Sequence, residues 1–414
     1  MTQISPDSNQ IDGKKSEHGT KSKHDNNTSQ NGTVQETHQD APNKDGQTNL
    51  RERIRHFTWA WFTSTMSTGG LGIALAETPH RFTGLYAIGV AVMILNIALF
   101  LFLSGLMVAR CLIDPVRFKR SFIHPAESFF FGSYLLSMVT IIGNIQLYGV
   151  TLGPASPWLI SAIHSLYWIY TGVAVVTGTL QFWVFMARTP ARPVPVNPAW
   201  FLLGYSNMLI GTLSALIAHS QPPERRAAVL VSGLTFQGFG FLFSLLLLTM
   251  YLTQLFERGL PPPDMRPGMY IPLGLFAYTI VALIGQAKAI PRDYGYWASH
   301  PMSVEILQTM ALLIGIFIWF FTFWLFAIAT ISCVMSIGKM GFKLPWWAFI
   351  FPNVGFAVGT AKIGIELQSE GIMWLSSVMT VLLAGMWLFT VVACIRGVWM
   401  KRILWPGMDE DKDM

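Results

Sequence analysis

The chain has 414 residues, of which 52% are hydrophobic and only 12% are charged, whereas average soluble domains carry about 25% charged residues. This composition excludes an ordinary soluble protein. Apolar runs of about 18 residues or more recur from residue 57 to residue 398, and each is long enough to cross a membrane as a helix. The net charge of +6 lies mostly in short loops, so it indicates membrane topology and argues against a nucleic-acid partner.

The two ends of the chain differ in composition from the rest. Residues 1–50 are rich in Asn, Ser, Thr, Gln, Asp and Lys and almost free of large apolar side chains, so ordering them would bury too little surface to offset the lost entropy. We expect a disordered N-terminal tail there, and no cleavable signal peptide, because this stretch lacks an apolar core. A short C-terminal tail, residues 404–414, leaves residues 51–403 as one transmembrane domain.

Between the tails, the apolar runs predict an all-α polytopic membrane protein with ten transmembrane helices. Their expected ranges are 57–76, 85–110, 126–149, 157–185, 198–218, 227–254, 269–287, 304–336, 346–366 and 372–398. Most of the basic residues that flank them lie on the side of the two termini, and the opposite loops hold only Arg81, Arg225, Arg226, Lys288 and Arg292. Because loops rich in basic residues stay in the cytosol, we expect both termini to be cytosolic.

The odd and even helices differ in composition. The even helices are longer and more apolar, whereas the odd helices carry small and polar residues at helical spacing. These residues include Thr65, Ser67 and Thr68 in the first helix, Ser137, Thr140 and Asn144 in the third, Asn207 and Gly211 in the fifth, and Tyr278 and Gly285 in the seventh. Small residues also serve close packing between membrane helices. Strict alternation over five hairpins nevertheless favours an inner ring of odd helices that line a pore.

The ninth expected helix, 346–366, gathers unusual residues on one face. They are Phe351, Gly355, Gly359, Lys362 and Glu366. Pro352 predicts a bend, and the glycines predict open space beside the Phe351 ring. An intramembrane lysine costs about 2.5–3.5 kcal/mol, so Lys362 is expected to face a polar interior. The face fits an anion pathway with an aromatic obstruction, and it fits equally a glycine packing seam with a lysine that snorkels to the lipid headgroups.

Basic residues at the ends of odd helices are candidate anion ligands. Lys288 and Lys362, near the loops that hold Arg81 and Arg225, could raise the local anion concentration at an outer mouth. Arg266 begins the seventh helix on the inner side. The alternative for each is an interfacial side chain that snorkels. The sequence holds no metal-ligand cluster, phosphate loop or nucleophile triad, and Cys111, Cys333 and Cys394 have unrelated spacings. We therefore expect no cofactor, no metal and no enzymatic activity.

Several sequence blocks point to a known family. The most specific are His56-Phe57-Thr58-Trp59 and Phe351-Pro352-Asn353-Val354-Gly355-Phe356, accompanied by Arg266-Pro267-Gly268-Met269 and Trp405-Pro406-Gly407. In this order, over roughly residues 50–410, they resemble fungal malic acid transport proteins. These proteins belong to the tellurite-resistance/dicarboxylate transporter family, which is distantly related to plant slow anion channels.

The resemblance implies five helical hairpins whose odd helices line a pore, with Phe351 as its aromatic gate. It also implies transport of malate and related C4 dicarboxylates across the fungal plasma membrane by a homo-oligomer, either a dimer or a trimer, surrounded by membrane lipids. The expected substrate-binding residues are Thr65, Ser67, Thr68, Thr140, Asn144, Asn207, Arg266, Lys288 and Lys362. One alternative is a sulfite or other small-anion efflux protein of the same fold, and another is a membrane sensor that transports nothing.

Overall fold

The computed structural model describes residues 50–124, 126–188 and 196–405. The expected tails, 1–50 and 404–414, lie outside this part apart from residues 50, 404 and 405. The chain divides into two units, residues 1–47 and 48–414, and every described residue belongs to the second. All regular elements that the structure describes are helices or helical turns, which confirms the predicted all-α fold class.

Five helices form a closed inner ring. Each of them contacts the next one in chain order, and the last, α12, contacts the first, α2. Their bounds are Phe62–Glu77 for α2, Phe131–Asn144 for α5, Trp200–Ile217 for α7, Gly274–Lys288 for α9 and Phe351–Glu366 for α12. These are the odd helices of the expected ten, so the prediction of an inner ring built from them is confirmed.

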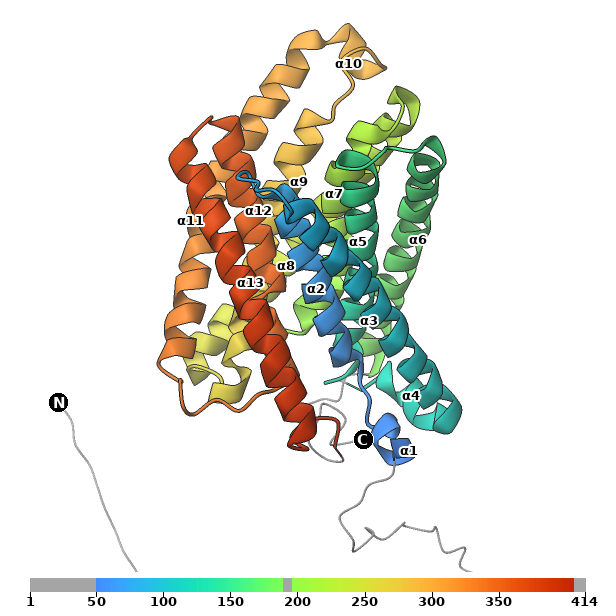
Figure 1. Cartoon of the computed structure of the whole chain (residues 1–414), viewed down its shortest axis with the longest axis vertical. Helices are drawn as coiled ribbons and strands as arrows, with labels where there is room; N and C mark the ends of the chain where they lie inside the picture. The colour runs from blue at the N-terminus through green and yellow to red at the C-terminus, as the bar shows by residue number, and fades with distance from the viewer. Residues whose placement is uncertain (1–49, 125, 189–195, 406–414) are drawn as a thin grey trace, which may run out of the picture. The chain divides into compact units, whose positions relative to one another are not determined.

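Five longer helices surround this ring (Figure 1). They are α3 (Leu85–Ile113), α6 (Pro157–Arg188), α8 (Pro223–Arg258), α11 (Pro301–Val334) and α13 (Glu370–Trp399). Each packs against its hairpin partner and one further inner helix. Only 17% to 28% of their most apolar stretches is buried, against 72% to 100% in the spans that contain α5, α7, α9 and α12. The outer helices therefore present apolar side chains outward, as a bilayer requires.

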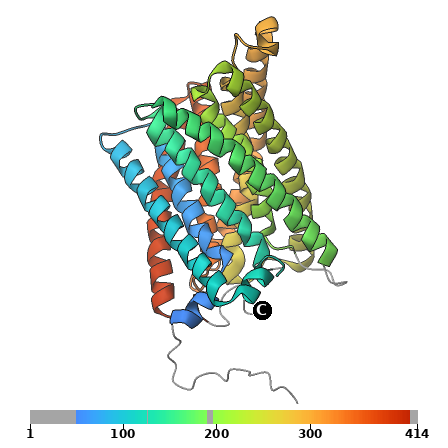
Figure 2. The same ribbon diagram turned by 90° about the vertical axis from the view of Figure 1, so that its right-hand side faces the viewer.

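Short helices cap the two ends of the bundle. They are α1 (Leu50–Arg55), α4 (Pro115–Ser121), the 3-10 turn η4 (Ala218–Ser220) and α10 (Tyr296–Ser299). In two perpendicular views, α1 and α4 lie at the end where the inner helices begin, and α10 lies at the opposite end (Figure 1, Figure 2). The five inner helices thus run in the same direction.

Nine helical segments in the described part of the chain are long and apolar enough to cross a membrane. The segment around α2, which is rich in serine, threonine and glycine, is not one of the nine, although α2 is one of the five helices of the ring. The count of ten membrane-crossing helices therefore stays a prediction, while the multi-pass architecture is confirmed.

Four of the five inner helices are preceded by a 3-10 segment, so these membrane segments are not continuous α-helices. These segments are η1 (Trp59–Trp61), η2 (Ser128–Phe130), η5 (Pro263–Leu273) and η6 (Leu344–Phe349), and α5 continues as a π-helical segment, η3 (Ile145–Thr151). The prediction that Pro352 bends a continuous helix over 346–366 is wrong, because the helical pattern breaks at Ile350 and Pro352 lies in the first turn of α12. A proline fits there because the first N–H groups of a helix have no intrahelical partner.

Candidate functional site

A cavity of about 600 Å³ lies at the end of the ring where the inner helices begin. We call it the vestibule. Each inner helix or its 3-10 entry contributes to the wall, through residues that include Met66, Phe130, Tyr205, Ile271 and Ala348. The end of α8, the loop that follows it and the segment 196–199 before α7 also line it. Small-molecule sites in proteins have volumes of about 300–1,000 Å³, so the vestibule can admit a small organic ion.

The vestibule has a positive electrostatic character. Arg258 and Lys343 are the charged residues among the described residues that line it. The inner helices also direct their N-terminal ends toward it, and a helix N-terminus carries a partial positive charge. Both basic residues were interpreted from the sequence only as markers of topology. Their positions, one at the end of α8 and one just before η6, are the signal that could have identified them as a pair.

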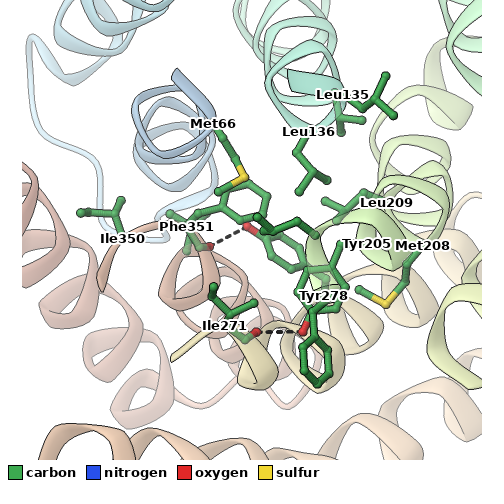
Figure 3. Close-up of a cluster of buried hydrophobic side chains, with 14 of the residues drawn as sticks. Met66, Leu135, Leu136, Tyr205, Met208, Leu209, Ile271, Tyr278, Ile350 and Phe351 are labelled. Carbon is green, nitrogen blue, oxygen red and sulfur yellow. Dashed lines mark hydrogen bonds between the residues drawn. The ribbon is translucent and has the colours of Figure 1, made fainter. Parts of the chain in front are cut away.

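The vestibule ends at a layer of packed side chains to which every inner helix contributes one residue. We call it the central layer, and it consists of Met66, Leu136, Tyr205, Tyr278 and Phe351. None of these side chains is more than 4% exposed. They converge between the five helices (Figure 3). The five side chains fill the space between the inner helices at this level.

Phe351 and Tyr278 form the best-defined contact of the central layer. Their ring centroids are 5.1 Å apart, and the Tyr278 hydroxyl donates a hydrogen bond to the Phe351 carbonyl oxygen at 2.7 Å. The Phe351 ring also lies against α2, where a Cβ atom added to Gly70 would be 3.1 Å from Phe351 Cδ2. Phe351 is therefore held by α2 on one side and α9 on the other.

The open space expected at Gly355 and Gly359, on the face that carries Phe351, is not present. A Cβ atom added to Gly355 would be 3.0 Å from the Tyr278 ring, and one added to Gly359 would be 3.3 Å from the carbonyl oxygen of Ala277. Both glycines thus allow α9 to approach α12 closely. That part of the prediction is wrong, because the glycine face is a helix packing surface.

The predicted polar residues of α2 are buried and hydrogen-bonded to neighbouring helices. The Thr65 hydroxyl lies 2.6 Å from Ser137 Oγ of α5, and Ser67 donates to a backbone carbonyl of η6 at 3.0 Å. Thr68 accepts a hydrogen bond at 3.0 Å from an indole N–H of α13. These bonds hold α2 in the ring, and a role of the three side chains in binding an anion stays a prediction.

The predicted polar residues of α5 and α7 lie in similar surroundings. Thr140 donates to a carbonyl of its own helix, while the Asn144 side-chain amide donates to the Gly69 carbonyl oxygen of α2 at 2.7 Å. Asn207 is 4% exposed and faces Gly178 of α6. Contact of these side chains with substrate also stays a prediction.

Arg266 connects elements at the vestibule end of the protein. Its guanidinium donates to the Ser332 carbonyl oxygen at 2.9 Å, to Ser336 Oγ, and to the Pro261 carbonyl oxygen at 3.1 Å. These contacts join η5 to the end of α11. Arg266 does not line the vestibule as Arg258 does, so its predicted role as a substrate ligand has no geometric support beyond its location at this end.

The two predicted lysines lie together at the opposite end of the ring, and each contacts a carboxylate. Lys362 Nζ is 2.8 Å from Glu77 Oε2, and both side chains are 18% exposed. Lys288 contacts Glu366. The expectation for Lys362 to face polar groups is met by Glu77, which lies one residue beyond the end of the first expected helix, 57–76.

A further ion pair was missed at the vestibule end. Arg110 at the end of α3 contacts Glu127, which precedes η2, and both side chains are fully buried. From the sequence, Arg110 is one of the basic residues that flank the expected helices on the side of the termini. A buried arginine needs a carboxylate partner, so this pair fastens the outer helix α3 to the entry of α5.

Comparisons with known proteins agree with this architecture. The sequence profile of the voltage-dependent anion channel family matches residues 56–395. The chain is 32% identical to the malic acid transport protein of Schizosaccharomyces pombe over 365 residues, which cover 87% of this chain and 83% of that protein. It is 25% identical to the sulfite efflux pump SSU1 of Arthroderma otae over 340 residues, which cover 81% and 88%. Since the profile spans all five hairpins, the chain is a multi-pass membrane protein of the voltage-dependent anion channel family.

Proposed function

We propose that this protein transports C4 dicarboxylates, namely malate and relatives of its size such as succinate and fumarate, along the axis of the inner ring. The vestibule carries this proposal, because it is central, large enough for such an ion and lined by Arg258 and Lys343 as its charged residues in the described chain. The similarity to a malic acid transport protein supports the choice of substrate. We place the protein in the plasma membrane, with the vestibule and both termini on the cytosolic side.

The proposed gate is Phe351 in the central layer. Helix α12 begins only at this residue, after Ile350, whose φ of −102° and ψ of −68° depart from helical values. Pro352 lies in the first turn of α12, where the N–H groups of any helix lack intrahelical partners, so fewer hydrogen bonds hold this turn than hold a helix interior. A small movement of this turn would carry the Phe351 ring away from the axis and open the path.

The central layer contains no charged residue, which bears on the form of the substrate that crosses it. A dianion loses much of its hydration in such a layer, and an unpaired charge in an apolar environment is costly. A C4 dicarboxylate that has bound one or two protons meets a smaller barrier. The substrate can therefore carry its own proton, without a carboxylate, histidine or lysine in the central layer.

Flux into liposomes tests the proposed substrate. Purified protein would be reconstituted, and uptake of labelled malate, sulfite and chloride would be compared. Arg258→Gln and Lys343→Gln should raise the half-saturation concentration for malate on the vestibule side, because each removes a positive charge from its wall. Arg292→Gln, at the opposite end of the protein, serves as the control and should leave this value unchanged. Malate uptake that no vestibule variant affects would contradict the assignment of the vestibule.

The second candidate function is efflux of sulfite or another small anion. The similarity to a sulfite efflux pump over 81% of the chain favours it. The same liposome assay decides between the two, since sulfite uptake without malate uptake would establish this alternative. Uptake of none of the three anions would favour a sensor that keeps the fold without transporting.

We also propose that the protein is a homo-oligomer, a dimer or a trimer, embedded in lipid. The outer helices expose large apolar side chains, among them Phe317, Phe320 and Trp399, and both lipids and a second copy can cover such a surface. Chemical crosslinking in native membranes, followed by mass measurement of the crosslinked species, tests the oligomeric state.

A further inference from the structure

The end of the ring opposite the vestibule carries two ion pairs. Helix α2 ends at Glu77, α9 ends at Lys288, and α12 holds both Lys362 and Glu366 in its last turns. His219, in the turn η4 that follows α7, lies within electrostatic range of both lysines. Three inner helices, α2, α9 and α12, and the turn η4 after α7 therefore bring a charged or titratable side chain to this mouth. We call the residues Glu77, Lys288, Lys362 and Glu366 the mouth cluster.

The pairs within the mouth cluster connect different helices. Lys362 and Glu366 are four residues apart on one face of α12 and could pair with each other, although a lysine that precedes a glutamate is the weaker order. Instead Lys362 contacts Glu77 of α2 at 2.8 Å, and Glu366 contacts Lys288 of α9. Both contacts tie α12 to its two neighbours in the ring.

We propose that Lys288 and Lys362 are a binding site for the two carboxylates of a dicarboxylate, and that Glu366 and Glu77 occupy this site when substrate is absent. The inference rests on the proposed function and names a second place on the same path. A carboxylate of the substrate offers the lysine ammonium group the same oxygen ligands as a glutamate does, so one can replace the other. A C4 dicarboxylate carries two such groups, and the mouth cluster holds two lysines.

The exposure of the cluster is compatible with this exchange. The side chains of Lys288 and Glu366 are 44% and 24% exposed, so ions can reach them from the aqueous phase. The side chains of Lys362 and Glu77 are 18% exposed and lie deeper. A substrate would then meet Lys288 first and Lys362 second.

Replacement of Glu77 and Glu366 by substrate carboxylates would also affect the proposed gate, Phe351. Release of Glu77 and Glu366 from the two lysines would free α12 from α2 and from α9 at this end. Phe351 is the first residue of the same helix. Binding at the mouth cluster would therefore loosen the element that carries the gate, and substrate would favour the open conformation.

A purely structural role for the two ion pairs predicts a different mutational pattern. If the pairs only fasten the helix ends, loss of either partner breaks the contact, and both losses shift transport in the same direction. If the glutamates compete with substrate, loss of a glutamate and loss of a lysine shift the affinity in opposite directions. The sign of the change therefore separates the two explanations.

The test measures the half-saturation concentration for labelled malate supplied from the mouth-cluster side. Glu77→Gln and Glu366→Gln should each lower it by about fivefold, which corresponds to about 1 kcal/mol of removed competition. Lys362→Gln and Lys288→Gln should raise it, and Lys288→Arg, which keeps the cation, should stay close to the wild type. Glu305→Gln is the matched control, because Glu305 pairs with Arg292 at 3.8 Å outside the inner ring.

The wild-type protein supplies an independent readout. Modification of Lys288 by an amine-reactive reagent, quantified by mass spectrometry, should fall in saturating malate and fall less in sulfite, which does not carry two carboxylates. Unchanged modification of Lys288 in malate, or a shift of the same sign in the glutamate and lysine variants, would overturn the inference. Absence of malate transport by the wild type would instead overturn the proposed function, so the two failures are distinguishable.

Discussion

Truncation of Phe351 to alanine tests whether this residue is a gate or a core residue. The side chain is 1% exposed and contacts α2 and α9 within the central layer. Removal of the Phe351 ring leaves the Tyr278 ring between the vestibule and the polar residues of the inner helices. We expect Phe351→Ala to open the layer partly and to let anions leak through.

The structure provides a control residue on the same helix. Phe356 is 3% exposed, but it packs outward against Trp319 and Phe326 of α11, with ring centroids 5.4 Å and 5.9 Å away. Phe356→Ala creates an enclosed void and should cost about 3–5 kcal/mol of stability. Phe351 borders the vestibule, so its truncation enlarges an existing cavity. We expect it to lower the free energy of unfolding only by the free energy of burying the side chain, about 1.5–3 kcal/mol.

Flux and stability are measured on the same purified variants. Phe351→Ala should raise malate leak into liposomes by about tenfold, which corresponds to about 1.4 kcal/mol off the barrier, with a small fall in melting temperature. Phe356→Ala should show the opposite pattern, a larger fall in melting temperature and no additional leak. If Phe351→Ala is stable but leaks no more than the wild type, the gate hypothesis is refuted and the side chain belongs to the packing or to the binding site.

The remaining predictions concern the buried polar groups. Arg110→Gln or Glu127→Gln should cost about 3–5 kcal/mol, because each leaves one buried charge without its partner, and a fluorescence-monitored melt would show it. Replacing both by Met and Leu should recover much of that loss, and no recovery would mean that the pair itself is required. Cysteines at positions 65, 140, 144 and 207, in a background without the native cysteines, should react with a small charged thiol reagent more readily when Phe351→Ala is present. Equal and low reactivity in both backgrounds would assign these positions to packing alone.

Composition and periodicity alone determined much of the fold. Alternation between apolar helices and helices striped with small and polar residues identified the inner and outer rings before any contact was known. Helix composition identifies the two rings because a helix face that contacts lipid and one that contacts other helices need different side chains. The place of Phe351 on an inner helix followed from the same reasoning.

The tertiary structure decided what the charged and glycine residues contact. Glu77 and Lys362 are 285 positions apart in the chain, and no local pattern pairs them. The glycines beside Phe351 could equally have faced open space or a neighbouring helix, and they face Tyr278 and α9. The vestibule is likewise built by segments from all five hairpins, so Arg258 and Lys343 come to line one cavity only in the folded chain. Such pairings depend on how far each helix is rotated about its axis and shifted along it, and these two quantities are set by packing between helices rather than by the sequence of any one of them.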